Sequence, residues 1–345
     1  MQSSVSSQPI EDVAESSHPN PNREMVWIAG GRFVMGSDHH YPEEAPAHDV
    51  TVDGFWIDKY AVTNEQFARF ADATGYVTTA ERPPRAEDYP GALPEMLRAA
   101  SVVFQKPPQR VDLRNHYNWW TYVPGAQWRH PEGPESSIQN RAQHPVVHLS
   151  FEDAEAYAKW AGKELPTEAE WEFAARGGLD KASYAWGEEM TPGGKFMANT
   201  WQGEFPLQNL RSDGYESTAP VGQYPANGYG VYDMIGNVWE WTADWYTAKH
   251  AAGKGCCGGV IPKGNRETSY DPQMPDIQIP RKVIKGGSFL CAENYCRRYR
   301  PAARMAQPVD TSTCHVGLRL IQRTLQPTST LHACCGAGDR KWSGT

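Results

Sequence analysis

The chain of 345 residues lacks an excess of basic residues, since 41 Asp and Glu outnumber 33 Lys and Arg and the net charge is −8. Without a basic stripe for phosphates, we expect no binding of nucleic acid. A run of about 18 consecutive apolar residues is also missing, so we expect no membrane span. The start of the chain has neither the cationic residues nor the apolar run of a secretion signal, which predicts a cytoplasmic protein.

Hydrophobic residues are scarce as well, at 39%, whereas Gly (31), Pro (27) and Trp (13) are plentiful. Abundant turn formers and large aromatic rings predict a fold dominated by loops, in which indoles supply much of the buried area. This composition argues against a helix bundle or a Rossmann sheet. The seven cysteines are an odd number, and in the cytoplasm we expect them to be reduced thiols.

The two ends of the chain differ from its middle in composition. Residues 1–23 and 325–345 are polar and lack apolar periodicity, which predicts disordered tails around a single domain at residues 24–324. Short strands are expected at Met25–Ile28 and at residues 32–35, separated by a glycine turn, and a third at residues 49–57. Residues 76–144 and 186–281 show little periodicity, and we expect them to be mostly loop. Bound ions are one way to hold such long irregular stretches in place.

Three helices have clear start and stop signals. Each begins at a Ser or Thr that can cap the first turn, and each is stopped by a glycine. The pairs of cap and stop are Thr63 with Gly75, Ser150 with Gly162, and Thr167 with Gly177.

The strongest chemical signal is the segment KGGSFLCAENYCRRYRPAAR at residues 285–304. Four residues separate Cys291 from Cys296, a spacing that would put them on different faces of a helix. Neighbouring glycines and a proline oppose a helix, so we expect a loop or bent strand on which the two sulfurs can converge. Cations close in sequence favour thiolate over thiol, and they are Arg297, Arg298, Arg300 and Arg304.

Two thiolates that converge suit a soft ion such as Cu(I). Tetrahedral zinc would need four ligands, and Cys314 with His315 could supply the other two. A structural disulfide or a pair of inert buried thiols also remains open, because C-x4-C alone is a weak motif.

The same segment resembles the active-site stretch of the formylglycine-generating enzymes, or sulfatase-modifying factors. The likeness covers residues 25–322, and the paired cysteines after GGS are its most specific part. The other matching blocks are MVWIAGGRFVMGSD, VTNEQFARFADATGY, HPVVHLSFEDAEAYAKWAGKELPTEAEWEFAARGG, ANTWQGEFP and YGVYDMIGNVWEWTADWY. The resemblance implies an irregular α+β fold related to the C-type lectins.

It also implies a reaction. Cys291 and Cys296 would hold Cu(I), and dioxygen would oxidise a cysteine in a C-x-P-x-R segment of a client sulfatase to formylglycine. Ser288 and Trp239 would lie beside the oxygen-binding side of the metal, although a turn hydroxyl and a core indole are the plainer interpretations of these two residues.

Two structural calcium sites are implied as well. Side-chain and backbone oxygens at short spacing in glycine-rich loops suit this hard ion of flexible geometry. The first set is Asn199, Thr200, Asp213 and Tyr215, and the second is Asp233, Gly236, Val238 and Glu240. The alternative is that these carboxylates only cap turns.

The chain departs from the family pattern at several positions. Pro301 and Leu320 replace cysteines of disulfides found in animal members. His315 stands where many members have a substrate-positioning asparagine, and it could titrate near neutral pH. Four cysteines have no counterpart and are predicted to be exposed bystanders, namely Cys256, Cys257, Cys334 and Cys335.

Two other classes of function remain open at this point. One is a related oxidoreductase with a different metal or substrate, such as an iron-dependent sulfoxide synthase. Its extra four-helix domain and histidine-rich iron motif are not found in the sequence. The other is a non-catalytic, lectin-like binding module, which would not need two thiols after GGS.

Overall fold

The first four strands form two antiparallel pairs. The computed structural model describes residues 24–250 and 264–323, so the predicted tails and Cys256, Cys257, Cys334 and Cys335 lie outside the described residues. β1 (Met25–Ile28) and β2 (Gly31–Met35) occur as predicted on either side of the glycine turn. β1 pairs with β4 (Phe55–Asp58), and β2 pairs with β3 (His48–Val52).

The expectation of one strand over residues 49–57 is therefore wrong. The strand is broken before Phe55, where Gly54 packs so closely on Trp27 that a Cβ would lie 2.5 Å from Cζ2 of the indole. β3 stays with β2, whereas β4 moves to a second sheet between β1 and β11 (Ile321–Arg323). The close approach at Gly54 is the local reason why the chain changes sheet here.

All three predicted helices are confirmed. α1 (Asn64–Thr74), α2 (Phe151–Trp160) and α3 (Glu168–Arg176) each begin at a capping box, in which the Ser or Thr accepts from the third backbone N–H. Gly75 and Gly177 end α1 and α3 in the left-handed conformation, where glycine has no steric penalty. None of the helices in the described ranges is both long and apolar enough to cross a membrane.

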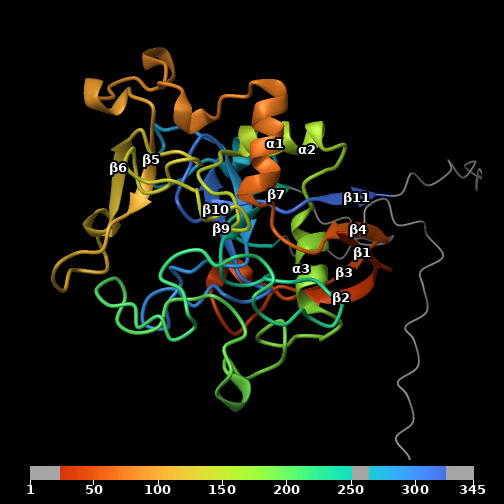
Figure 1. Cartoon of the computed structure of the whole chain (residues 1–345). Coiled ribbons are helices and arrows are strands. Elements are labelled where there is room, and N and C mark those ends of the chain that lie inside the picture. Colours follow the sequence, from red (N-terminus) through yellow and green to blue (C-terminus); the bar gives the residue numbers. More distant parts are fainter. Residues whose placement is uncertain (1–23, 251–263, 324–345) are drawn as a thin grey trace, which may run out of the picture.

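One hairpin within residues 76–144 was not predicted. β5 (Ala100–Phe104) pairs with β6 (Trp120–Pro124), and both lack the apolar and polar alternation that signals a strand. Figure 1 shows this hairpin on the side of the molecule opposite to β1, β4 and β11. The rest of residues 76–144 contains only short 3-10 turns, at Thr79–Glu81, Ala86–Asp88, Pro94–Met96 and His116–Asn118. Another such turn, Pro42–Glu44, lies earlier in the chain, between β2 and β3.

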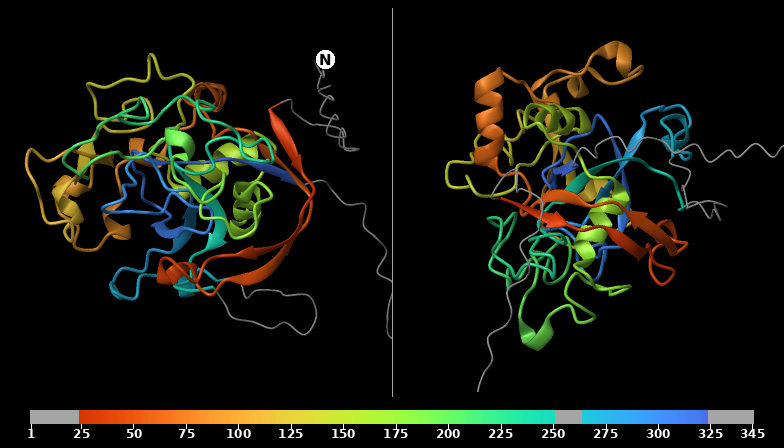
Figure 2. Two further views of the ribbon diagram at one scale, coloured as in Figure 1. Left: turned by 90° about the horizontal axis from the view of Figure 1, so that it is seen from below. Right: turned by 90° about the vertical axis from the view of Figure 1, so that its right-hand side faces the viewer.

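The central sheet has the strand order β10-β7-β8-β9. β7 (Trp239–Trp245) pairs in parallel with β10 (Val316–Gly317), while β8 (Arg281–Lys285) and β9 (Arg304–Pro308) add antiparallel neighbours. The stretch between α3 and β7, green to cyan in Figure 2, has no strand and one 3-10 turn at Pro192–Gly194. A further turn, Glu267–Ser269, precedes β8. The expected α+β class with little regular secondary structure is confirmed.

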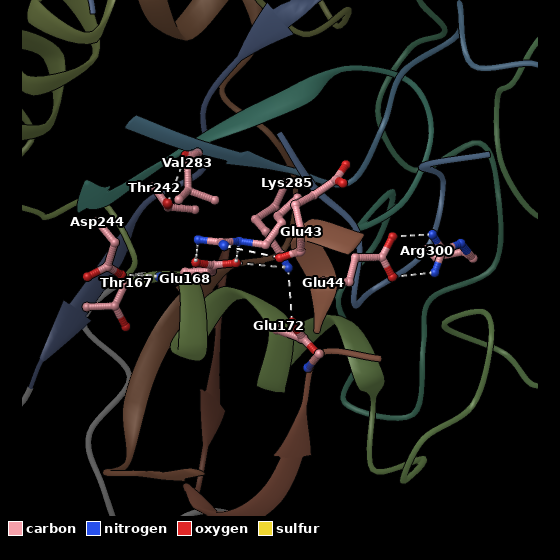
Figure 3. Close-up of polar contacts among 12 residues, drawn as sticks. Glu43, Glu44, Thr167, Glu168, Glu172, Thr242, Asp244, Val283, Lys285 and Arg300 are labelled. Atoms are coloured by element: carbon pink, nitrogen blue, oxygen red, sulfur yellow. Dashed lines mark hydrogen bonds and ion pairs between the residues drawn. The ribbon is translucent and has the colours of Figure 1, made fainter. Parts of the chain in front are cut away.

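Buried ion pairs join α3 to the central sheet (Figure 3). Nζ of Lys285 in β8 lies 3.0 Å from one oxygen of Glu172, and Arg176 lies 2.7 Å from the other. Lys285 and Glu172 are both 0% exposed. Burial alone would raise the pKa of Glu172, but the two cations outweigh it and lower the pKa to about 2. The fold around β8 therefore depends on a carboxylate that stays ionised in the interior.

Glu172→Ala is expected to reduce the free energy of unfolding by about 3–5 kcal/mol, because it leaves the buried Arg176 without an ion-pair partner and Lys285 with only Glu168, at 3.6 Å. Since the pKa is lower in the folded than in the unfolded chain, the contribution is complete above about pH 5 and is lost as the pH falls toward about 2. Denaturant unfolding at pH 7 and pH 3 measures both effects. The control, Asp49→Ala, removes an exposed pair with Arg32 and should change stability by less than about 1 kcal/mol. Equal losses in the two variants would contradict the prediction.

Candidate metal and substrate site

A tight loop after β8 brings the two predicted cysteines together. Gly286 and Gly287 have positive φ angles of 96° and 72°, and a Cβ on Gly287 would lie 3.0 Å from the backbone of Arg298. The chain thus doubles back on itself without a helix, as predicted. The sulfurs of Cys291 and Cys296 lie 3.2 Å apart and both residues are buried.

This pair is not a disulfide. A disulfide bond is about 2.05 Å long, and the structure has free thiols at Cys291, Cys296 and Cys314. The alternative of a structural bridge between Cys291 and Cys296 is therefore wrong.

The two sulfurs differ in their affinity for a proton. Burial, together with the neighbouring sulfur, raises the pKa of Cys291 well above its usual value. The hydrogen bond from Cys291 and the charge of Arg298 outweigh burial at Cys296 and lower its pKa to about 6. At neutral pH the pair therefore holds one thiolate on Cys296 and one thiol that donates to it.

Only one of the four nearby arginines contacts the sulfurs. Nη1 of Arg298 lies 3.9 Å from the sulfur of Cys296, and the guanidinium also pairs with Glu43 at 2.6 Å. Arg300 binds the buried Glu44 (Figure 3), and Arg304 binds Glu168 at 2.7 Å. The remaining one, Arg297, interacts with Tyr184 and Tyr299. Of the four arginines predicted from their sequence proximity to stabilise the thiolates, only Arg298 contacts one of the sulfurs.

The paired cysteines line a cavity of about 590 Å³ together with Trp239, Ser288 and His315. The structure thus brings the four residues of the predicted catalytic set and the predicted substrate-positioning His315 to one cavity. Trp239 is only 1% exposed, so it is also part of the core. The wall and rim are largely aromatic, with contributions from His116, Tyr117, Trp119, Trp120, Tyr122, Phe205 and Tyr295.

Ser288 and His315 form a buried polar pair on the cavity wall. Oγ of Ser288 lies 3.2 Å from Nδ1 of His315, and the backbone N–H of Ser288 donates to the sulfur of Cys291 at 3.4 Å. Burial lowers the pKa of His315 to about 3. The expectation that His315 titrates near neutral pH is wrong, because desolvation keeps the imidazole neutral.

The zinc alternative is not supported by the geometry. Cys314 lines a different cavity from Cys291, Cys296 and His315, and its thiol accepts from the backbone N–H of Phe104 at 3.3 Å. Within residues 24–250 and 264–323, no three or more His, Cys, Asp and Glu side chains gather in a way that could hold a metal. Four-coordinate zinc is therefore excluded for the described part of the chain.

Two oxygens of the first predicted calcium set lie close together. Gln202 donates both to the carbonyl of Thr200 and to Oδ2 of Asp213, so these two oxygens converge. Tyr215 donates its backbone N–H to the other oxygen of Asp213 at 3.1 Å. Oδ1 of Asn199 is buried without a hydrogen-bond partner. Asn199 directly precedes Thr200 in the chain, and an unsatisfied acceptor in the same loop as two converging oxygens is compatible with a hard cation.

The second predicted set fits in part. Asp233 has a positive φ of 52°, one carboxylate oxygen that accepts from Gly222, and one that is buried without a partner. Burial raises the pKa of Asp233 to about 6. Glu240 instead accepts from Arg319 at 2.9 Å and from the indole of Trp171 at 2.7 Å. In the structure Glu240 is thus paired with Arg319, whereas Oδ1 of Asp233 has no hydrogen-bond partner.

Asn237 is a residue whose role was not predicted. Its Oδ1 accepts from the backbone of Ala219 and from Asn199, and its own carbonyl accepts from Phe289 at 2.9 Å. The left-handed φ of 57° makes these contacts possible. Asn237 therefore connects the two loops predicted to bind calcium to the loop that carries Cys291. A Gly-Asn pair just before a strand was its only sequence signal.

A family model described as the sulfatase-modifying factor enzyme 1-like domain matches residues 11–324, and the chain belongs to this family. It is 51% identical over 301 residues to the formylglycine-generating enzyme of Mycobacterium tuberculosis, covering 86% of this chain and 97% of that protein. Identity to the formylglycine-generating enzyme of Thermomonospora curvata is 47% over 312 residues, covering 89% and 96%.

A solved structure shares the fold. PvdO from Pseudomonas aeruginosa matches with a TM-score of 0.56 and 25% identity, covering 87% of this chain and 94% of that chain. The irregular, C-type-lectin-like fold implied by the sequence resemblance is confirmed.

Arg298→Met is expected to raise the pKa of Cys296 from about 6 to ~7 or above, because an adjacent cation stabilises the thiolate by one or more pKa units. The pH dependence of alkylation at Cys296 in the metal-free chain, followed by mass spectrometry, gives the midpoint. Arg110→Met, which removes a surface partner of Glu204, is the matched control and should leave the midpoint unchanged. An unchanged midpoint in Arg298→Met would show that Arg298 does not set this ionisation.

Proposed function

We propose that the protein oxidises a cysteine of client sulfatases, within a C-x-P-x-R segment, to formylglycine with copper and dioxygen. The observation that carries the proposal is the pair of free sulfurs 3.2 Å apart at the wall of a cavity of about 590 Å³. The names of the bacterial relatives, formylglycine-generating enzyme, support the same reaction.

Cys291 and Cys296 fit Cu(I) by the chemistry of their donor atoms. Thiolates are soft ligands that select this ion over hard cations, and Cys296 carries a thiolate near neutral pH. Copper, when bound, supplies the one-electron and dioxygen chemistry that the side chains of the protein cannot perform. Such a reduced thiol pair also accords with the expected cytoplasmic location, where thiols stay reduced.

The residues around the pair have roles that follow from their positions. Arg298 stabilises the negative charge on Cys296, and its own pairing with Glu43 fixes the guanidinium. The backbone N–H of Ser288 holds the sulfur of Cys291, while His315, neutral at pH 7, offers Ser288 a hydrogen-bond partner without adding charge. Trp239, which is 1% exposed, forms part of the apolar wall of the same cavity.

The size and the rim of the cavity fit a polypeptide substrate. Tyr117 is 72% exposed and Met96 is 51% exposed, and both line the cavity. Exposed apolar side chains at the mouth of a pocket are typical of a site that binds another chain. A client segment in extended conformation can therefore place its cysteine at the sulfurs while its neighbours contact the rim.

We further propose that the two loops bind structural calcium. The first ion would be held by Asn199, Asp213 and backbone oxygens of Thr200 and Tyr215. The second would be held by Asp233 with backbone oxygens of Gly236 and Val238, and Glu240 would contribute while it remains paired with Arg319. The unsatisfied oxygens of Asn199 and Asp233 support both sites.

Cys291→Ser and Cys296→Ser are each expected to abolish conversion of a C-x-P-x-R peptide, a loss larger than the roughly 10–100-fold typical of outer-shell changes at metal sites. Mass spectrometry detects the change from thiol to aldehyde after incubation with Cu(I) and oxygen. Cys314→Ser is the matched control, because this buried free thiol lies in another cavity and should leave turnover intact. Turnover retained in either cysteine variant, or no conversion of any such peptide by copper-loaded wild type, would end the proposal.

Calcium is expected to raise the thermal unfolding midpoint. When the free calcium concentration is 100 times the dissociation constant of one site, the folded chain is stabilised by about 2.7 kcal/mol. Asn199→Ala and Asp233→Asn should each reduce the rise, and Asp53→Asn, an exposed carboxylate, should not. Because the pKa of Asp233 is about 6 without an ion, the rise should shrink as the pH falls through that value. A midpoint that calcium up to millimolar concentration leaves unchanged would contradict both sites.

A further inference from the structure

A buried histidine lies behind one wall of the cavity that contains the paired sulfurs. His148 is 0% exposed, and its backbone N–H donates to the carbonyl of Thr313 at 2.9 Å. Thr313 and His315 both line that cavity. His148 is therefore hydrogen-bonded, from the interior, to residues 312–315, which we call the wall segment.

The backbone of His148 adopts a conformation that is unfavourable for a residue with a side chain. Its φ angle is 63°, which lies in the left-handed region. Such a residue costs about 1–3 kcal/mol, persists only where the surrounding structure fixes it, and is found most often at functional sites. The contacts of His148 must therefore outweigh both this strain and the burial of a polar ring.

Both ring nitrogens of His148 have a partner, and together these partners fix one tautomer. Nε2 lies 2.8 Å from the carbonyl oxygen of Pro131, and Nδ1 lies 2.7 Å from Oγ of Ser101. A carbonyl can only accept, so Nε2 carries a proton. Burial lowers the pKa of His148 to about 4, so the ring is neutral at pH 7 and Nδ1 accepts the hydrogen of the Ser101 hydroxyl.

Ser101 extends this contact to the wall segment. Its oxygen lies 2.6 Å from Oγ of Ser312, and because its own hydrogen is used at His148, the hydroxyl of Ser312 donates to it. Ser101 and Ser312 are only 1% and 6% exposed, so water does not compete for these bonds. His148 thus holds the wall segment twice, through its backbone at Thr313 and through Ser101 at Ser312.

The wall segment leads directly to His315, whose Nδ1 lies 3.2 Å from Oγ of Ser288. We propose that His148 is a positioning residue, which fixes the wall segment and thereby places His315 against Ser288 on the side of the cavity that a client segment would contact. The effect on turnover rests on the proposed oxidation, whereas the effect on His315 does not. The sulfurs are held by another loop and by Arg298, so His148 should affect turnover and not the affinity for copper.

His148→Leu and His148→Asn test the proposal. Asparagine adopts the left-handed conformation readily and its Oδ1 can accept from Ser101, whereas leucine does neither. The first measurement is NMR of the imidazole nitrogens of His315 in the full, metal-free chain. These signals are expected to shift in His148→Leu and to stay close to those of wild type in His148→Asn.

The second measurement is turnover of a C-x-P-x-R peptide by the copper-loaded chain. We expect kcat/KM to fall about tenfold to 100-fold in His148→Leu, as a misplaced wall predicts, and to be partly restored in His148→Asn. Affinity for Cu(I), measured by competition with bathocuproine disulfonate, should equal that of wild type in both variants.

Phe173→Leu is the control for lost stability. Phe173 is buried in α3 and packs against Phe33 and Tyr229, so the change leaves a small cavity in the core without contacting the wall segment. It should lower the thermal unfolding midpoint but preserve both the His315 signals and kcat/KM. If His148→Leu does not fold, Ser312→Ala replaces it, because the loss of this single hydroxyl should shift the same His315 signals.

The outcomes separate positioning from stability. A lower unfolding midpoint in His148→Leu with wild-type His315 signals and kcat/KM would overturn the proposal. A loss of kcat/KM in Phe173→Leu as large as in His148→Leu would overturn it too, and equal losses in His148→Asn and His148→Leu would refute the role of the Ser101 contact. Absence of turnover in wild type would end the proposed oxidation, whereas the His315 signals would still decide whether His148 positions the wall.

Discussion

The contact between the sulfurs of Cys291 and Cys296 is the interaction on which the proposed chemistry depends. The two thiols lie 3.2 Å apart in the protein interior, where the loss of a proton from either one is unfavourable because burial disfavours the charged thiolate. Arg298, fixed by Glu43, contacts the sulfur of Cys296 and stabilises the charge there more than on Cys291. The pair therefore presents one ionised ligand before any metal arrives, and the second needs to lose its proton only on binding.

The loop that holds this pair has almost no regular structure, so its geometry must be fixed by side chains. Lys285 is tied to Glu172 of α3 just before the glycine turn, and Arg300 and Arg304 are tied to Glu44 and Glu168 just after the pair. Buried ion pairs are weak sources of net stability, but each one is costly to break. Their distribution on both sides of the cysteines suits a segment that must keep one conformation without a helix or strand.

The sequence was sufficient where a local rule decides the structure. Capping boxes and stop glycines predicted three helices, and the glycines around Cys291 correctly opposed a fourth. Predictions failed where a tertiary contact decides. The break before β4 depends on Trp27 pressing on Gly54, and the neutrality of His315 depends on burial by residues distant in sequence. The zinc alternative with Cys314 stayed open in the sequence because adjacency along the chain does not reveal which cavity a side chain faces.

That last case explains how one segment can serve two cavities. Thr313 and His315 line the cavity of the paired sulfurs, while Cys314 between them lines the other. The backbone N–H of Cys314 donates to the carbonyl of Val102 at 3.0 Å, and its sulfur accepts from the backbone N–H of Phe104 at 3.3 Å. Cys314 is therefore hydrogen-bonded to two residues of β5. The position of His315, and with it the hydrogen bond to Ser288, is therefore tied to β5 through the backbone of this segment.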